Sequence, residues 1–144
     1  MPSDEHFRRL ERMYLTAPVN DYYHPHLTVG EGQARLEIAV RPEFFHAANA
    51  VHGSVYFKAL DDAAFFAVNS LVEDVFVLTV TFNIELLRPV SSGTLMAEGR
   101  VLHASPRLYT AESELRDDEG KLIALGRGTF LPSTIALTPE VGYA

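Results

Sequence analysis

The alternation of apolar and polar residues predicts a helix followed by strands in the first forty residues. In SDEHFRRLERMYL (residues 3–15), apolar residues recur at helical spacing from Phe7 to Tyr14, after Ser3 as the N-cap. In QARLEIAV (33–40), apolar and polar residues alternate as they do in a half-buried strand. The two glycines just before this segment predict a turn from an earlier strand.

The most apolar segment of the chain is GSVYFKALDDAAFFAVNSL, residues 53–71. It leaves hardly any polar face at helical spacing, and a helix that is apolar nearly all round is buried. We therefore expect one central helix of about five turns, at 3.6 residues per turn. The preceding residues, 43–52, have no clean period and predict a loop.

The rest of the chain predicts strand after strand. Turn residues separate four segments that are rich in strand-forming residues: 75–90, 94–105, 107–117 and 121–132. Three hairpin-like turns between them predict an antiparallel meander, and the tail after Pro132 gives only weak signals, as a loosely held end would. We expect an α+β fold in a single domain spanning 1–144, with a core of about 24–132, in which the sheet curls around the helix.

Composition and charge narrow the classes of function. The chain has 144 residues, no cysteine and a formal net charge of −7. The absence of cysteine excludes disulfides, thiolate zinc sites and cysteine nucleophiles. The negative charge disfavours nucleic-acid partners, and no run is long and apolar enough for a membrane helix. We expect a cytoplasmic protein, and a homodimer or homotetramer because a sheet around one helix leaves edges that need partners.

Two adjacent carboxylates in the middle of the apolar helix are the first candidates for chemistry. A buried carboxylate costs free energy unless it is paired, hydrogen-bonded or placed at a cleft. Lys58 lies one turn before Asp62 and can pair with it. Asp61 has Phe57 and Phe65 four residues away on either side, which makes it an unpaired acid among apolar groups and a candidate catalytic residue.

The start of the same helix, His52-Gly53-Ser54, is the second candidate. Helix N-termini present free N–H donors that bind oxyanions or carbonyl oxygens, and glycine lets a ligand approach the backbone. The helix from Gly53 to Asp61 spans about 13 Å, so both groups of one chain cannot reach one carbonyl. A two-fold dimer with antiparallel helices would bring the Gly53 of one chain to the Asp61 of the other.

The segment HGSVYFKALDDAAFFAVNS resembles the hotdog-fold thioesterases of the phenylacetate-pathway (PaaI-like) type. That family has His-Gly-Gly with an Asp nine residues after the His, and Asp61 is nine after His52. NIELLRP (83–89) and GKLIALGRGTF (120–130) resemble the family's later strands, so the likeness covers roughly residues 24–132.

The resemblance implies hydrolysis of an acyl-CoA thioester without a metal or separate cofactor, because coenzyme A is part of the substrate. It implies that the Gly53 amide holds the thioester oxygen while Asp61 of the facing subunit acts as nucleophile or general base. Thr79 matches a position where the family often has a Ser or Thr that helps to place the water or the carboxylate. Phe57 and Phe65 are candidates to line an acyl tunnel.

The chain departs from the family pattern at three positions near the helix start. Ser54 stands where the family has a second Gly, His46 where it tends to have Asn, and Asn49 where it tends to have Gly. His46 can donate a hydrogen bond as the Asn would, and we count it with His52 among the catalytic candidates and Ser54 and Asn49 among the substrate-binding ones. Two alternatives stay open: a hotdog hydratase or dehydratase acting on acyl thioesters, and an acyl-CoA-binding module without catalysis.

Overall fold

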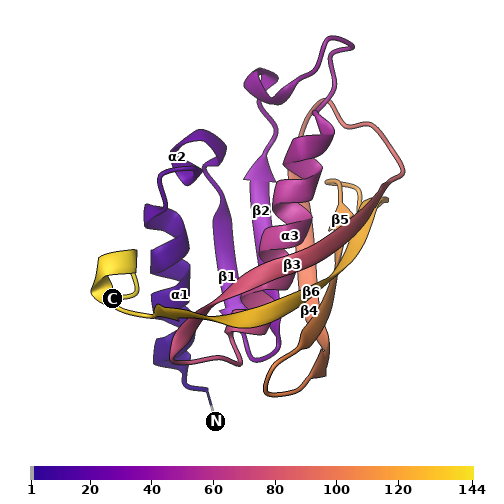
Figure 1. The fold of residues 1–144 in the computed structure, drawn as a ribbon. Coiled ribbons are helices and arrows are strands. Elements are labelled where there is room, and N and C mark those ends of the chain that lie inside the picture. Colours follow the sequence, from indigo (N-terminus) through magenta and orange to yellow (C-terminus); the bar gives the residue numbers. More distant parts are fainter. Residues whose placement is uncertain (1) are drawn as a thin grey trace.

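The computed structural model describes residues 2–144 and contains three α-helices and six strands (Figure 1). In chain order the elements are α1 (Asp4–Thr16), α2 (Asn20–Tyr23), β1 (His26–Gly30), β2 (Gln33–Ala39), a 3-10 turn (Pro42–Phe44), α3 (Gly53–Asn69), β3 (Val75–Leu86), β4 (Thr94–Ala104), β5 (Tyr109–Arg116), β6 (Leu122–Ala136) and a second 3-10 turn (Pro139–Val141). The strands form one antiparallel sheet in the order β1-β2-β4-β5-β6-β3. Because this sheet curves around α3, the prediction of an α+β fold is confirmed.

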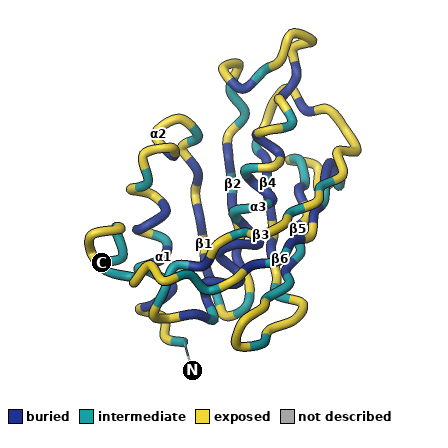
Figure 2. Tube along the Cα trace, viewed as in Figure 1, coloured by how far each residue is buried: buried dark blue, intermediate teal, exposed yellow. Residues whose placement is uncertain are grey.

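The central helix is buried along most of its length (Figure 2). Small residues let the sheet approach it closely: a Cβ added to Gly99 of β4 would lie 2.3 Å from the carbonyl oxygen of Ala63. Ser113 of β5 also donates a hydrogen bond to the carbonyl oxygen of Leu60, at 2.7 Å. These contacts fix the position of α3, and with it the carboxylates that it carries.

The prediction of a four-strand meander is wrong for the first of its strands. β4, β5 and β6 follow one another in the sheet, but β3 pairs with β6 at the edge and ends at Leu86. The residues that follow β3 form no tight turn, because Leu87 N–H binds the carbonyl oxygen of Ile123 and Val51 N–H binds that of Val90. β4 therefore begins at Thr94 between β2 and β5, and β5 and β6 separate it from β3 in the sheet.

The helix that begins the chain agrees with the predicted one, and Ser3 accepts a hydrogen bond from the backbone N–H of His6 as its N-cap. The expectation of a loosely held tail is wrong. β6 continues to Ala136, and Tyr143 lies 2.8 Å through its hydroxyl from Nδ1 of the buried His6. The C-terminal turn thus lies beside α1 (Figure 1), held by a contact that joins the two ends of the chain.

Within residues 2–144, no helix is long and apolar enough to cross a membrane.

Candidate active site

Asp61 lies midway along α3, where β3 crosses the helix. Its Oδ1 accepts a hydrogen bond from the hydroxyl of Thr79 on β3, at 2.9 Å. The side chain is half-buried, and it faces the same cavity as Thr79. The structure therefore brings together two of the predicted site residues that are 18 positions apart.

Asp62 points to other partners. Its Oδ2 lies 2.6 Å from Nζ of Lys58 and accepts a hydrogen bond from the hydroxyl of Tyr14, at 2.5 Å. The Lys58–Asp62 pair expected from the i,i+4 spacing is present. Burial and the neighbouring Asp62 raise the pKa of Tyr14, so this phenol stays protonated and remains a donor.

The surroundings of Asp61 change its acidity. Burial, followed by the negative charge of Asp62, raises the pKa of Asp61 from 3.8 to about 6, while the Thr79 hydroxyl and the Lys58 ammonium oppose the rise. A carboxylate that titrates near neutral pH can accept a proton from water or attack a carbonyl carbon. The Asp61 carboxylate is therefore both basic enough and accessible enough for acyl-transfer chemistry.

A cavity of about 360 Å³ opens beside Asp61, between α1, α3 and β3. Its walls are mainly apolar and aromatic, with the two aspartates and Lys58 on one side. The lining residues are Met13, Tyr14, Ala17, Val19, Asn20, Lys58, Asp61, Asp62, Phe65, Phe66, Phe76, Leu78, Thr79 and Val141. Such a cavity suits an apolar acyl group whose reacting carbon lies at the carboxylate.

The N-terminus of α3 lies at a different location from the Asp61 cavity. His52 caps the helix: its Nδ1 accepts a hydrogen bond from the backbone N–H of Ser54, at 3.0 Å, and lies 2.8 Å from the Ser54 hydroxyl. Val55 N–H binds the carbonyl oxygen of His52. The N–H of Gly53, the first helical residue, has no acceptor within its own helix.

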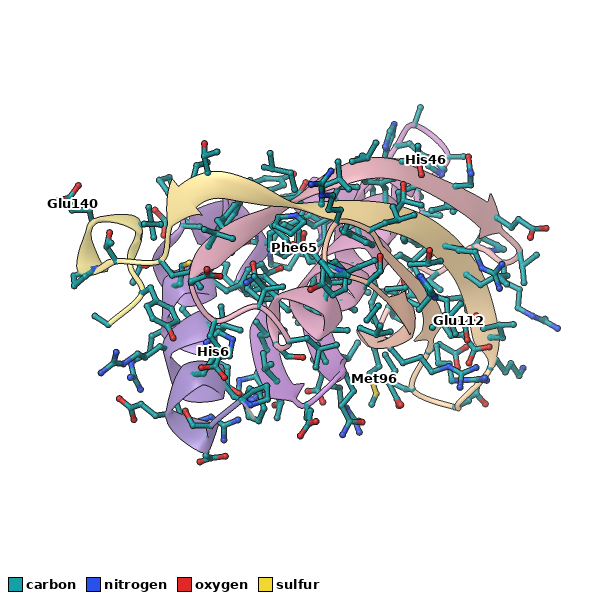
Figure 3. The ribbon with its side chains drawn as sticks, turned by 60° about the horizontal axis from the view of Figure 1, so that its bottom comes forward. His6, His46, Phe65, Met96, Glu112 and Glu140 are labelled. Atoms are coloured by element: carbon teal, nitrogen blue, oxygen red, sulfur yellow. The ribbon has the colours of Figure 1, made fainter. Side chains whose placement is uncertain are left out.

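A second cavity, of about 320 Å³, lies at this helix start and is lined by Gly53, His46, Tyr56 and Arg88 together with Val51, Leu86, Leu87 and Pro89. The rings of His46 and His52 are 6.5 Å apart. His46 lies at the rim of the molecule, whereas Phe65 points into its interior (Figure 3). One chain therefore holds most of the predicted site residues in two groups, one near each cavity.

Two predicted substrate-binding residues lie outside both groups. Asn49 is exposed in the loop before α3, with a positive φ of 62°, and its carbonyl oxygen accepts a hydrogen bond from Ser91. Phe57 is 39% exposed and packs edge-on against Phe82. Neither side chain lines the cavity beside Asp61, whereas Phe65 does.

The sequence does not predict that the N-terminal helix contributes Tyr14 to the site. Tyr14 reaches Asp62 across 48 positions, and no periodicity in the sequence links the two. The apolar spacing that put Tyr14 on the buried face of α1 was the only available signal, and it indicated packing. Within the described range 2–144, no group of three or more His, Asp or Glu side chains is arranged to hold a metal ion.

Comparison with known proteins identifies the family. Residues 48–124, more than half of the chain, match the family described as the thioesterase superfamily. The chain belongs to the thioesterase superfamily. The match includes both the helix start and Asp61. It confirms the predictions of a thioesterase and of a hydrolase, and the similarity to solved structures confirms the hotdog fold.

Individual members of the superfamily and solved structures agree with this assignment. A protein of Archaeoglobus fulgidus, provisionally named an esterase, is 32% identical over 72% of this chain, and the match spans 66% of that protein's length. A provisionally named esterase of Mycobacterium tuberculosis is 30% identical over 69% of this chain and 74% of its own length. The PaaI protein of E. coli, from the phenylacetic acid degradation operon, has a TM-score of 0.86, covers 96% of this chain and 100% of its own, and is 22% identical. That last likeness shows the hotdog fold alone.

Proposed function

We propose that the protein hydrolyses an acyl-CoA thioester to the free acid and coenzyme A, with Asp61 as nucleophile or general base. The observation that carries the proposal is the Asp61 carboxylate, bound by Thr79 at the wall of an apolar cavity, with a pKa raised to about 6. Near neutral pH most of this carboxylate is ionised, and it is more basic than an ordinary aspartate. The acyl group would occupy the cavity, with Phe65 as part of its wall.

The bond changes follow from this placement. As a general base, Asp61 takes a proton from a water molecule whose oxygen attacks the thioester carbon. The C–S bond then breaks, and the proton passes to the departing thiolate of coenzyme A. As a nucleophile, Asp61 forms a mixed anhydride with the acyl group and expels the thiolate, and water then hydrolyses the anhydride. In both routes Thr79 orients the carboxylate through its hydrogen bond.

Stabilisation of the developing oxyanion requires a second protomer in this proposal. Gly53 and Asp61 of one helix are about 12 Å apart along its axis, too far to act on one carbonyl group. The edge strand β3 supports dimerisation. Among residues 2–144 one side of β3 has no strand neighbour, and Leu78, Val80 and Leu86 on it are about half exposed. A two-fold pairing at this edge would bring the Gly53 N–H of the partner to the Asp61 cavity.

The remaining residues near the start of α3 would then help to bind the same substrate molecule. His52 and Ser54 form the cap that orients the first turn of α3. His46, which lines the cavity at Gly53, would donate a hydrogen bond to the thioester oxygen or to a nearby part of coenzyme A. Asn49 lies in the same exposed loop, where it would contact the nucleotide part of the substrate.

The test is thiol release from a panel of short-chain, long-chain and aromatic acyl-CoAs. We expect the wild type to cleave one of these classes and Asp61→Asn to reduce kcat at least about a hundredfold, as removal of a general base or nucleophile does. The matched control is Glu98→Gln, which makes the same carboxylate-to-amide change at an exposed position of β4. Full activity in Asp61→Asn would refute the proposal.

Products and labels separate the alternatives. Binding of acyl-CoA without thiol release would indicate a binding module, and addition of water to an enoyl-CoA without thiol release would indicate a hydratase. A single turnover in ¹⁸O-water tests for the anhydride route. Label on Asp61 would show an anhydride that water attacked at the Asp61 carbonyl carbon, whereas the general-base route puts ¹⁸O into the product acid alone.

A further inference from the structure

A second polar cluster lies beside the Asp61 carboxylate and has no part in the steps described above. It consists of Lys58 and Asp62 on α3 and Tyr14 on α1. The Lys58 ammonium and the Tyr14 hydroxyl meet on the same oxygen, Oδ2 of Asp62. Lys58 Nζ also lies 5.0 Å from the centre of the Tyr14 ring and 5.1 Å from that of Tyr23 on α2.

This cluster differs from an ordinary surface ion pair. The side chains of Lys58 and Asp62 are only 14% and 16% exposed, and Tyr14 is buried, with its ring against Phe66. Removing such a pair from water carries a desolvation penalty, and apolar residues of similar volume often fill the same space at no loss of stability. Packing alone therefore gives no reason for two opposite charges at this point of an otherwise apolar helix.

The two neighbouring carboxylates, Asp61 and Asp62, form their hydrogen bonds with different elements of the fold. Asp61 bonds to Thr79 on β3, and Asp62 bonds to Lys58 and to Tyr14 on α1, yet both line one cavity. We infer that Lys58, Asp62 and Tyr14 are positioning residues that hold one negative charge at a set place beside Asp61 and keep the Asp62 carboxylate away from the reacting group. This inference rests on the proposed role of Asp61.

The charges around Asp61 come from few groups. On its own helix these are Asp62, which raises the pKa of Asp61, and Lys58, which lowers it. The titratable group that faces the pair from α1 is Tyr14, and β3 contributes the uncharged hydroxyl of Thr79. Tyr23 of α2 lies near Lys58 and Asp62. Asp62 and Lys58 thus act on the same carboxylate with opposite signs.

Opposite signs make the inference testable. Asp62→Asn removes the negative charge and leaves the ammonium, so the acid limb of the pH profile of kcat/KM moves to lower pH by about one unit. Lys58 also lowers the pKa of the buried Asp62, so its charge is removed in the Asp62→Asn background. Adding Lys58→Met to Asp62→Asn removes the positive charge, and the limb moves back to higher pH. Lys58→Arg keeps the charge and leaves the limb close to that of the wild type. A side chain with only a structural role would change stability or activity at every pH without moving the limb.

A second readout does not require turnover. The carboxyl carbon of Asp61, labelled with ¹³C and assigned by its loss in Asp61→Asn, reports the titration of this group by NMR. The matched control is the exposed pair of Glu5 and Arg9, which has the same i,i+4 spacing on α1. Glu5→Gln and Arg9→Met should move neither the NMR titration nor the acid limb.

A shift to lower pH in Asp62→Asn and a shift back to higher pH when Lys58→Met is added to it, with no shift in the control variants, would support the inference. Unmoved titrations, or shifts in the same direction, would overturn it. If the wild type releases no thiol from any acyl-CoA, the proposed function fails, while the NMR titration still decides whether the cluster acts on Asp61. If the wild type hydrolyses a thioester but both readouts stay unmoved, the inference alone fails.

Discussion

Replacing Asp61 with Asn should abolish activity and make the protein more stable. The Asn keeps the shape of the side chain, and its carbonyl oxygen can still accept the hydrogen bond from Thr79. The substitution removes the negative charge. In the wild type the pKa of the Asp61 carboxyl is raised from 3.8 to about 6, because burial and Asp62 disfavour its ionised form. A raised carboxylate pKa means that the folded protein holds this proton more tightly than the unfolded chain does.

The magnitude follows from linkage. The shift of about 2 pH units corresponds to about 3 kcal/mol of lost stability once the group is ionised in both states. Well below pH 3.8 the carboxyl is protonated in both the folded and the unfolded state, and the cost is absent. It develops as the pH rises from about 4 to about 6 and is then constant. The gain in the free energy of unfolding of Asp61→Asn over the wild type should therefore be about 3 kcal/mol at pH 7.5 and less than about 1 kcal/mol at pH 4.

Urea denaturation at both pH values measures this difference, with the protomer concentration held fixed because oligomerisation would contribute to stability. Glu98→Gln serves as the control, since its exposed carboxylate should give a small and nearly pH-independent difference. An Asp61→Asn variant that is no more stable than the wild type at pH 7.5 would refute the reasoning. So would a gain that stays the same at pH 4.

Two further changes test the hydrogen bond at the site and the packing beneath it. Thr79→Val removes the donor that lowers the pKa of Asp61, so the acid limb of kcat/KM should move to higher pH by up to about one unit; a steady-state pH profile checks this, and an unmoved limb would contradict it. Gly99→Ala should destabilise the fold by about 2 kcal/mol or more in urea denaturation, because its Cβ would lie 2.3 Å from the backbone oxygen of Ala63. Gly30→Ala is its control, since the new Cβ would meet only the movable side chain of Gln33 at 3.3 Å, and equal losses in the two variants would count against the packing argument.

The pattern of residues was sufficient for the elements and for local pairs. The central helix, the N-terminal helix and the apolar-in alternation of β2 depend on spacings of a few residues, which the sequence displays directly. The pairing of Lys58 with Asp62 is of the same kind, because residues four apart lie on one face of a helix. The place of β3 in the sheet could not be read in this way. Its pairing with β6 is accompanied by a connection to β4 whose backbone hydrogen bonds go to β6 and to the loop before α3, both far away in the sequence.

The candidate site also has some features that the local sequence predicts and others that depend on the tertiary structure. Local sequence alone identified Asp61 as an acid among apolar residues and Gly53 as a helix start, because both features belong to one continuous helix. Only the tertiary structure decided that α1 contributes Tyr14 to Asp62, that an apolar cavity opens beside the carboxylate, and that burial raises its pKa. Desolvation depends on every atom packed around a group, and those atoms come from segments far apart in the chain. For this reason the identity of the acid could be read from the chain, while its basicity and its surroundings required the fold.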